Sequence, residues 1–395
     1  MRSPPSLARV LAPFAPGRFL ADVWGEKPLH VRGAPRKFAG LFGWRALNDL
    51  LATQRLEPPR LRLAMEGASA ADLRSFLQYR LNREEQRTAR LDVHRLNSRL
   101  ARGATLVLNE VQEMHPPLGA LTREFARLFV AEPNVNLYAS FGRRPGFGPH
   151  WDDHDVFVLQ LAGEKRWLIY GPSRRHPLHR DVRPNEMQPV RPVARYRLHP
   201  GDLLYIPRGH WHDAIAVGEP TLHLTLGISP LTAVDYLTWV ADDLRAVESM
   251  RRDLPLFDDK RREEWHRTLN AAVLPRLNEK TLKRFLEGRR ARLDASTRPA
   301  LPHAIAGTTR LGNGDRLQWT GSTGTAHRDA AGLTVRSGGR EYVFDPAAAP
   351  LIERLLSGKA VSYGRLLRSF GRQLGAGRLR RFVGELLREH FVTIV

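Results

Sequence analysis

Between Ala104 and about Leu226 the chain is a series of short apolar runs, and this pattern constrains the fold more than any other feature. Glycine, proline or aspartate separates the runs, and several of them alternate between apolar and polar residues. Such alternation is typical of antiparallel strands with one buried face. Many short strands with punctuated turns indicate a sandwich or a barrel. The runs are ATLVLNEV, NVNLYASF, DVFVLQL, KRWLIYG, YRLHPGDLLYIP, DAIAV and TLHLTLGI.

Helical patterns lie on both sides of this β-rich stretch. Before it, residues 19–35 predict a short helix that ends at a glycine, followed by an extended run and a turn, and residues 46–56 and 71–100 predict further helices. After it, residues 231–254 and 263–293 predict helices with an apolar stripe and a basic remainder. We therefore expect an α+β protein.

Length and pattern together predict three parts. A chain of 395 residues is too long for one ordinary domain. The stretch from Thr297 to Gly307 contains two prolines and is a plausible boundary. Two strand-like pieces, three helical stretches and a final FVTIV follow it, and helices with a small β-wing suggest a winged helix. We predict a β-rich domain at 1–230, a helical region at 231–296 and a winged-helix-like domain at 297–395.

Charge and cysteine content limit the partners and the chemistry. The net charge is +21 and the sequence pI is about 11.1, which favours an anionic partner such as nucleic acid. Only seven of the 62 basic residues are lysine, so a coding bias toward arginine is the alternative origin of the charge. The chain has no cysteine, which excludes disulfides, iron–sulfur clusters and thiol nucleophiles. Any metal must therefore be held by His, Asp or Glu.

Nothing in the sequence predicts contact with a membrane. The first twenty residues lack the apolar core of a signal peptide. No run of about 18 apolar residues is long enough for a spanning helix. We therefore expect a cytoplasmic protein.

The stretch GPHWDDHDVFVLQLAGEKRW contains the strongest candidate site. In a strand, residues i and i+2 share a face, so His150 and Asp152 are expected to point together as half of a metal site. A third ligand must come from a distant strand, and the segment GDLLYIPRGHWHDAIAV supplies a histidine just past its second turn. Strand parity does not choose between His210 and His212, because both are expected on one face.

Two histidines and one carboxylate on one side of a metal form the facial arrangement of non-haem Fe(II) oxygenases. Three protein ligands leave three positions, which can hold a bidentate 2-oxo acid and dioxygen. The far carboxylate of such a co-substrate needs a counter-charge, and Lys165 on the next strand is the candidate. A cation buried beside Trp167 and Tyr170 is costly without an anionic partner.

Three other histidines in this region are predicted to have lesser roles. We expect His154 at the rim of the site and His199 in a loop. His223, in an alternating strand, either lines the pocket or is a core histidine with its hydrogen bonds satisfied, and we favour the core position.

Two segments, NVNLYASFGRRPGFGPHWDDHDVFVLQLAGEKRW and PGDLLYIPRGHWHDA, resemble the Jumonji C ribosomal oxygenases, a cupin-like family that hydroxylates ribosomal proteins. The opening FLADVWGEKPLHVRGAP is also similar to that family. The resemblance implies a double-stranded β-helix, Fe(II), 2-oxoglutarate and O2. It places the metal triad on His150, Asp152 and His212. It places co-substrate contacts on Lys165, Asn136 and Tyr138.

One position departs from the family pattern. The related strand often ends in a serine near the co-substrate, and this chain has Gly227 there. Within the family, arginine-hydroxylating bacterial members tend to carry arginine where Lys165 stands, and histidine-hydroxylating members carry lysine. The resemblance therefore favours a histidine target over an arginine target.

The expected function is hydroxylation of a His or Arg side chain of a ribosomal protein. A basic enzyme would meet that substrate on an RNA-containing particle, and GRLRRFVGELLREHF has a helix face suited to phosphate contact. The alternatives are the same chemistry on a free or carrier-bound amino acid or peptide, and a non-catalytic cupin-like module that binds RNA or DNA. The apolar stripes between Leu231 and Leu293 are wider than a linker needs, and relatives dimerise through this region, so we expect a homodimer.

Overall fold

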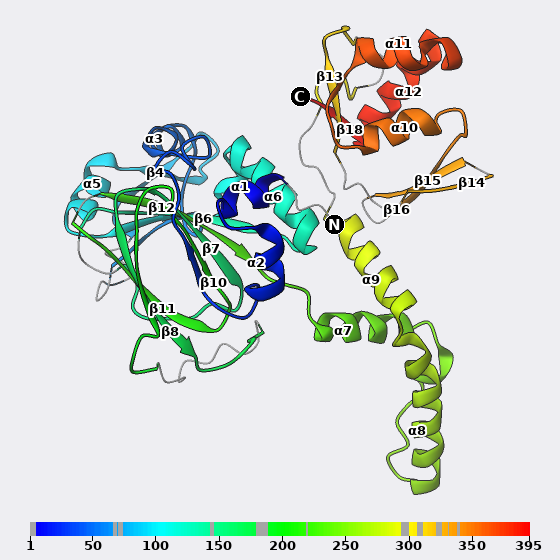
Figure 1. The fold of residues 1–395 in the computed structure, drawn as a ribbon, viewed down its shortest axis with the longest axis horizontal. Coiled ribbons are helices and arrows are strands. Elements are labelled where there is room, and N and C mark those ends of the chain that lie inside the picture. The colour runs from blue at the N-terminus through cyan, green and yellow to red at the C-terminus, as the bar shows by residue number, and fades with distance from the viewer. Residues whose placement is uncertain are drawn as a thin grey trace. The chain divides into compact units, whose positions relative to one another are not determined.

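A computed structural model describes residues 5–65, 69, 74–142, 146–178, 189–218, 220–293, 300–305, 311–320, 326–330, 332–337 and 340–395. The chain divides into two compact units, Met1–Pro230 and Leu231–Val395. Figure 1 shows the elements of each unit. The predicted boundary at residue 296 lies outside the described residues, so the three-part division stays a prediction. Among the described helices, none is both long enough and apolar enough to cross a membrane.

The N-terminal unit is built on two antiparallel sheets. The larger has seven strands in the order β1-β10-β7-β12-β6-β5-β2, and the smaller has the order β11-β8-β9. Each predicted strand run of this region forms a strand. The strands are β1 Leu29–Val31, β2 Leu61–Ala64, β3 Leu77–Leu81, β4 Arg87–Leu91, β5 Thr105–Leu108, β6 Asn134–Ser140, β7 Asp155–Ala162, β8 Lys165–Pro172, β9 Ala194–Leu198, β10 Leu203–Ile206, β11 His210–Ala216 and β12 Thr221–Ile228.

Helices cover one face of the large sheet. Alternate residues of β7, such as Phe157, pack on this side against Phe19 and Phe125 from the helices and Tyr205 from β10. The rings of Phe19 and Tyr205 meet edge-on, with centroids 4.9 Å apart. The helical elements are α1 Pro5–Leu11, α2 Pro16–Asp22, α3 Trp44–Thr53, α5 Val93–Ala101, the short 3-10 helix η1 Val111–Glu113 and α6 Pro116–Phe129.

The small sheet packs on the opposite face of the large one. Val156 and Val158 of β7 form a second buried cluster with Trp167 and Ile169 of β8. β7 is therefore buried on both faces, which explains why its sequence is almost continuously apolar. Lys165 has the same strand parity as Trp167 and Ile169, so its side chain points between the two sheets.

The helix prediction for residues 71–100 is correct only at its end. Residues 77–91 form the hairpin β3–β4, and helix α5 follows. The turn is made by Asn82, whose side-chain oxygen accepts hydrogen bonds from the backbone N–H groups of Glu84 and Gln86 at 3.0 and 2.8 Å. This Asx turn reverses the chain, and Glu85 adopts a φ of 60°. Residues 71–73 lie outside the described part.

The C-terminal unit begins with helical elements and ends in a mixed module. The predicted helices of residues 231–254 and 263–293 are present, and so are the strands predicted from GLTVRS and REYVFD. The elements are α7 Ala233–Leu244, η3 Glu248–Arg251, α8 Asp259–Val273, η4 Leu274–Arg276, α9 Glu279–Arg292, β13 Arg316–Trp319, β14 Ala326–Asp329, β15 Gly332–Ser337, β16 Arg340–Phe344, α10 Ala349–Leu356, β17 Val361–Ser362, α11 Tyr363–Leu374, α12 Ala376–Arg388 and β18 Val392–Ile394.

Candidate metal centre

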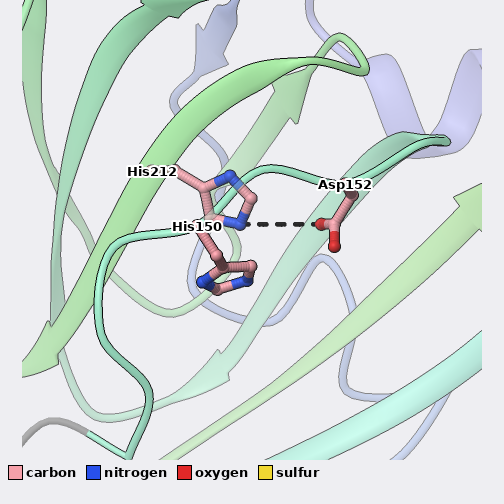
Figure 2. A group of neighbouring side chains, drawn as sticks. All are labelled: His150, Asp152 and His212. Atoms are coloured by element: carbon pink, nitrogen blue, oxygen red, sulfur yellow. Dashed lines mark ion pairs between the residues drawn. The ribbon is translucent and has the colours of Figure 1, made fainter. Parts of the chain in front are cut away.

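His150, Asp152 and His212 come together at one end of the space between the two sheets (Figure 2). Each offers one ligand atom, and these atoms lie within 4.8 Å of one another. Nε2 of His212 is 3.6 Å from Oδ2 of Asp152, and the two imidazole rings have centroids 4.4 Å apart. Among the described residues, no other group of three His, Asp or Glu side chains has such geometry.

The local backbone differs from the strand assumed for this pair. His150 forms an isolated antiparallel bridge with His212, and Asp152 lies in the loop before β7. The backbone N–H of Gly209 donates to the carbonyl of Asp152 at 2.9 Å, which anchors that loop beside β11. The predicted grouping of the side chains is present, but the bridge and this anchor produce it rather than strand parity.

The two histidines that strand parity could not distinguish line different cavities. The pairing with β8 shifts register between His210 and His212. His212 lines the pocket with His150, whereas His210 lines a small separate cavity beside Arg208. The expectation that both lie on one face of the strand stays a prediction, and the cavities distinguish the two residues.

The backbone selects the tautomer of both histidines. Nδ1 of His150 donates to the carbonyl of Gly148 at 2.9 Å, and Nδ1 of His212 donates to the carbonyl of His210 at 3.1 Å. A carbonyl can only accept, so each Nδ1 carries the proton and each Nε2 keeps its lone pair for a metal. Burial, together with nearby His150, lowers the pKa of His212 to about 4, so this ring is neutral at pH 7.

Lys165 lies at the deep end of the same pocket. Its side chain is 5 % exposed, and Nζ is 6.0 Å from the centre of the Trp167 ring. Burial lowers the pKa of Lys165 to about 8, although the Asp213 carboxylate acts in the opposite direction. A buried ammonium group facing a cavity fits an anionic ligand.

His223 also lines the pocket, contrary to the expectation of a core histidine with satisfied hydrogen bonds. It is buried, and its Nδ1 has no hydrogen-bond partner. Its ring stacks on Tyr138 at 4.9 Å and meets Trp167 edge-on at 5.7 Å. Burial, and then the charge of Lys165, hold the pKa of His223 well below its usual range. Nε1 of Trp167 is likewise buried without a partner.

The pocket has a volume of about 320 Å³. Asn136 and Tyr138 line it from β6, as expected, and Arg62 and Phe147 line it as well. The Arg62 guanidinium lies over the Phe147 ring at 5.3 Å. Nothing in the sequence around Arg62 indicated this position, because only the pairing of β2 with β5 brings it there.

Gly227 makes room for His154. A Cβ atom at position 227 would lie 2.6 Å from Cδ2 of His154, far inside van der Waals contact. His154 lines the pocket and is half-buried, which agrees with a place at the rim. Burial lowers the pKa of His154, but the carboxylates of Asp153, Asp152 and Asp155 outweigh it and raise that pKa overall.

Comparisons with known proteins agree with this geometry. Residues 112–236 match the JmjC domain family. The chain is 27 % identical over 226 residues to the Drosophila persimilis bifunctional lysine-specific demethylase and histidyl-hydroxylase NO66, covering 56 % of this chain and 31 % of that protein. It is 28 % identical over 227 residues to chicken (Gallus gallus) ribosomal oxygenase 1, covering 55 % and 35 %. The chain thus spans about a third of the length of these relatives.

The fold is also similar to that of a solved structure. Escherichia coli ribosomal oxygenase YcfD aligns over 97 % of this chain and 98 % of its own, with a TM-score of 0.56 and 17 % identity. YcfD has been solved in complex with cobalt and 2-oxoglutarate. At this identity the likeness concerns the fold, which is a JmjC cupin fold of mixed helices and sheets. Residues 112–236 are therefore similar to the JmjC domain family, and the expected resemblance to the ribosomal oxygenases is confirmed.

Proposed function

We propose that this protein is an Fe(II)- and 2-oxoglutarate-dependent dioxygenase that hydroxylates a side chain of a ribosomal protein. One observation carries the proposal: a His-Asp-His set with both Nε2 atoms available opens into the same pocket as a buried lysine. In this proposal the two facing sheets form a double-stranded β-helix and the C-terminal module is a winged helix. A ribosomal substrate would place the protein in the cytoplasm.

The donor set fits the metal. Two neutral imidazoles and one carboxylate on one side of an ion suit Fe(II) and leave positions for a chelating co-substrate. His150, Asp152 and His212 would hold the ion. When bound, Fe(II) with 2-oxoglutarate and O2 supplies the oxidant that inserts oxygen into a C–H bond.

The deep end of the pocket fits the far carboxylate of 2-oxoglutarate. Lys165 would provide the counter-charge, and the unpartnered Nδ1 of His223 and Nε1 of Trp167 would each donate a hydrogen bond. Asn136 and Tyr138 would complete the wall beside the co-substrate. These residues orient the co-substrate and exclude water from its inner end.

The lining favours a neutral target side chain. Arg62 and Lys165 are cations of the pocket, and Asp152 is the one carboxylate among its described lining residues. With Asp152 engaged by the metal, a substrate guanidinium would find no acidic partner there. A neutral imidazole avoids this cost and packs against Phe147 and Tyr138, so we propose histidine rather than arginine as the target.

The test is succinate formation from 2-oxoglutarate with Fe(II), ascorbate and ribosomal-protein peptides containing histidine or arginine. We expect turnover by the wild-type protein and a mass increase on the histidine peptides, both absent from His150→Ala and Asp152→Ala. An arginine peptide as the better substrate would refute the histidine target. A wild-type protein without any turnover would instead favour the non-catalytic binding module.

The partners proposed are the ribosomal protein, ribosomal RNA and a second copy of the chain. The exposed apolar residues of the helical region support a homodimer, because Phe257 is 99 % exposed and Leu254 and Leu256 are 57 % and 65 % exposed. Light scattering at micromolar concentration should report a dimer, and Phe257→Ser should weaken it. A wild-type monomer under these conditions would refute it.

A further inference from the structure

We infer that the C-terminal module binds single-stranded RNA in a pocket formed by the segment before α10, the end of α11 and α12. The pocket lies within residues 345–385 and has a volume of about 350 Å³. Figure 1 shows the three helices together in this module. The inference gives the proposed RNA contact a location, and it uses no residue of the candidate metal centre.

Helix α11 ends at this pocket and helix α12 begins there, and the stretch that they form is strongly basic. The stretch from Tyr363 to Gly384 contains six arginines and no acidic residue. All six are exposed, and none is in an ion pair with the described part of the chain. Spacings of three and four residues put the three arginines of α11 on one face. The six are Arg365, Arg368, Arg372, Arg378, Arg380 and Arg381.

Composition alone does not explain this distribution. Elsewhere in the same unit, arginines lie beside carboxylates: Arg261 is 3.5 Å from Asp258, and Arg276 and Arg284 are 3.1 and 2.8 Å from Asp243. A coding bias toward arginine would raise the number of arginines everywhere, but it would not leave the stretch from Tyr363 to Gly384 without an acidic residue. An anionic partner accounts for both features.

The pocket has an apolar wall with one aromatic ring. Gly375, at a φ of 78°, forms the tight turn between α11 and α12, so Leu374 and Leu379 meet across it. Phe382 extends this wall from the next turn of α12. Its ring is held edge-on by Phe344, with centroids 6.1 Å apart and planes at 84°. A half-buried, fixed ring is suited to stacking with a nucleobase.

The polar groups around the wall match the rest of a nucleotide. Arg378 and Arg381 lie one turn apart beside Phe382 and would bind the phosphates on either side of a stacked base. Asp345 and Glu385 also line the pocket, and their carboxylates would accept hydrogen bonds from base N–H groups. Both contacts require base edges that are not paired, which favours single-stranded RNA over a duplex.

The experiment measures binding of the full-length protein to a fluorescent RNA of about ten nucleotides, by anisotropy at several salt concentrations. The variant Arg378→Gln/Arg381→Gln should weaken binding by about tenfold and reduce the salt slope by roughly 1.4. Phe382→Leu, which keeps apolar volume, should weaken binding by about tenfold without changing the slope. The matched control Arg261→Gln/Arg262→Gln removes the same charge from α8 and should change neither.

The proposal fails if the wild-type protein does not bind this RNA, or if the control costs as much affinity as the pocket double variant. It also fails if duplex DNA, single-stranded DNA or polyglutamate competes as well as unlabelled RNA. Thermal melting checks that each variant is folded, and the arginine variant tests the site even if Phe382→Leu does not fold. Oxoglutarate turnover on a free peptide should be unchanged in the arginine variant, so this proposal and the oxygenase proposal fail separately.

Discussion

The backbones of His150 and His212 exchange two hydrogen bonds, at 3.1 and 2.7 Å, although the residues are far apart in the sequence. This bridge places their imidazole rings next to each other before any metal is bound. The free energy of ordering the two rings is therefore part of folding, and a metal meets a prepared site.

The first prediction separates His212 from its neighbour. His212→Ala should reduce Mn(II) affinity by at least about a hundredfold, because it removes a direct ligand. His210→Ala should leave Mn(II) affinity unchanged, because His210 lines another cavity. Calorimetric titration of the two purified variants decides the matter, and equal losses would contradict the assignment of the third ligand.

The second prediction concerns the buried charge of Lys165. Its folded pKa of about 8 lies below its unfolded value of 10.5. Between these values the unfolded state binds more protons, so stability rises with pH across this window and the lysine is destabilising below pH 8. Lys165→Met should therefore raise the free energy of unfolding at pH 7 by about 3 kcal/mol without co-substrate.

Urea denaturation of both proteins at pH 7 and pH 10 measures this effect, and the difference between them should shrink at pH 10. Lys37, whose pKa burial also lowers to about 8, contributes equally to both proteins and cancels. The same variant should lose 2-oxoglutarate binding. A Lys165→Met protein less stable than wild type at pH 7 would mean that the amine is already neutralised in the free protein.

The third prediction concerns His223. His223→Leu removes one donor to the co-substrate carboxylate and should weaken 2-oxoglutarate binding by about ten- to a hundredfold. Anaerobic titration of the Mn(II)-loaded protein with 2-oxoglutarate, followed by calorimetry, measures this directly. Mn(II) affinity should be unchanged. His199→Ala, an exposed loop position, is the control, and an unaltered affinity in His223→Leu would return His223 to a packing role.

The fourth prediction tests whether Gly227 and His154 depend on each other. Gly227→Ala should destabilise the protein by about 1–3 kcal/mol, because the new Cβ would overlap the His154 ring. His154→Ala in the same chain should remove most of that cost. A double-mutant cycle in urea isolates the coupling, and additive effects would show that the two positions are independent.

Strand predictions based on the alternation of apolar and polar residues are confirmed where a strand is regular. The strands from Ala104 onward are predictable from the sequence, because each buries alternate residues against a neighbouring sheet. In β8, Lys165 has the same parity as the buried Trp167 and Ile169. These features depend on local geometry, which a sequence encodes directly.

Other features depended on irregular backbone or on distant contacts. Strand parity does not distinguish His210 from His212, which line different cavities. The pattern of residues 77–91 predicts a helix, but these residues form a hairpin whose turn is made by the side chain of Asn82. Arg62 reaches the pocket only through sheet pairing.

Residue type and local spacing are sufficient to predict the β-rich core, the candidate ligand types and the basic character of the chain. Contacts between distant segments place His212 rather than His210 in the group with His150 and Asp152, and they leave Nδ1 of His223 without a hydrogen-bond partner. They also require Gly227 to be small, because the atoms that crowd it come from His154, far away in the sequence. Such properties belong to pairs of residues that only the fold brings into contact.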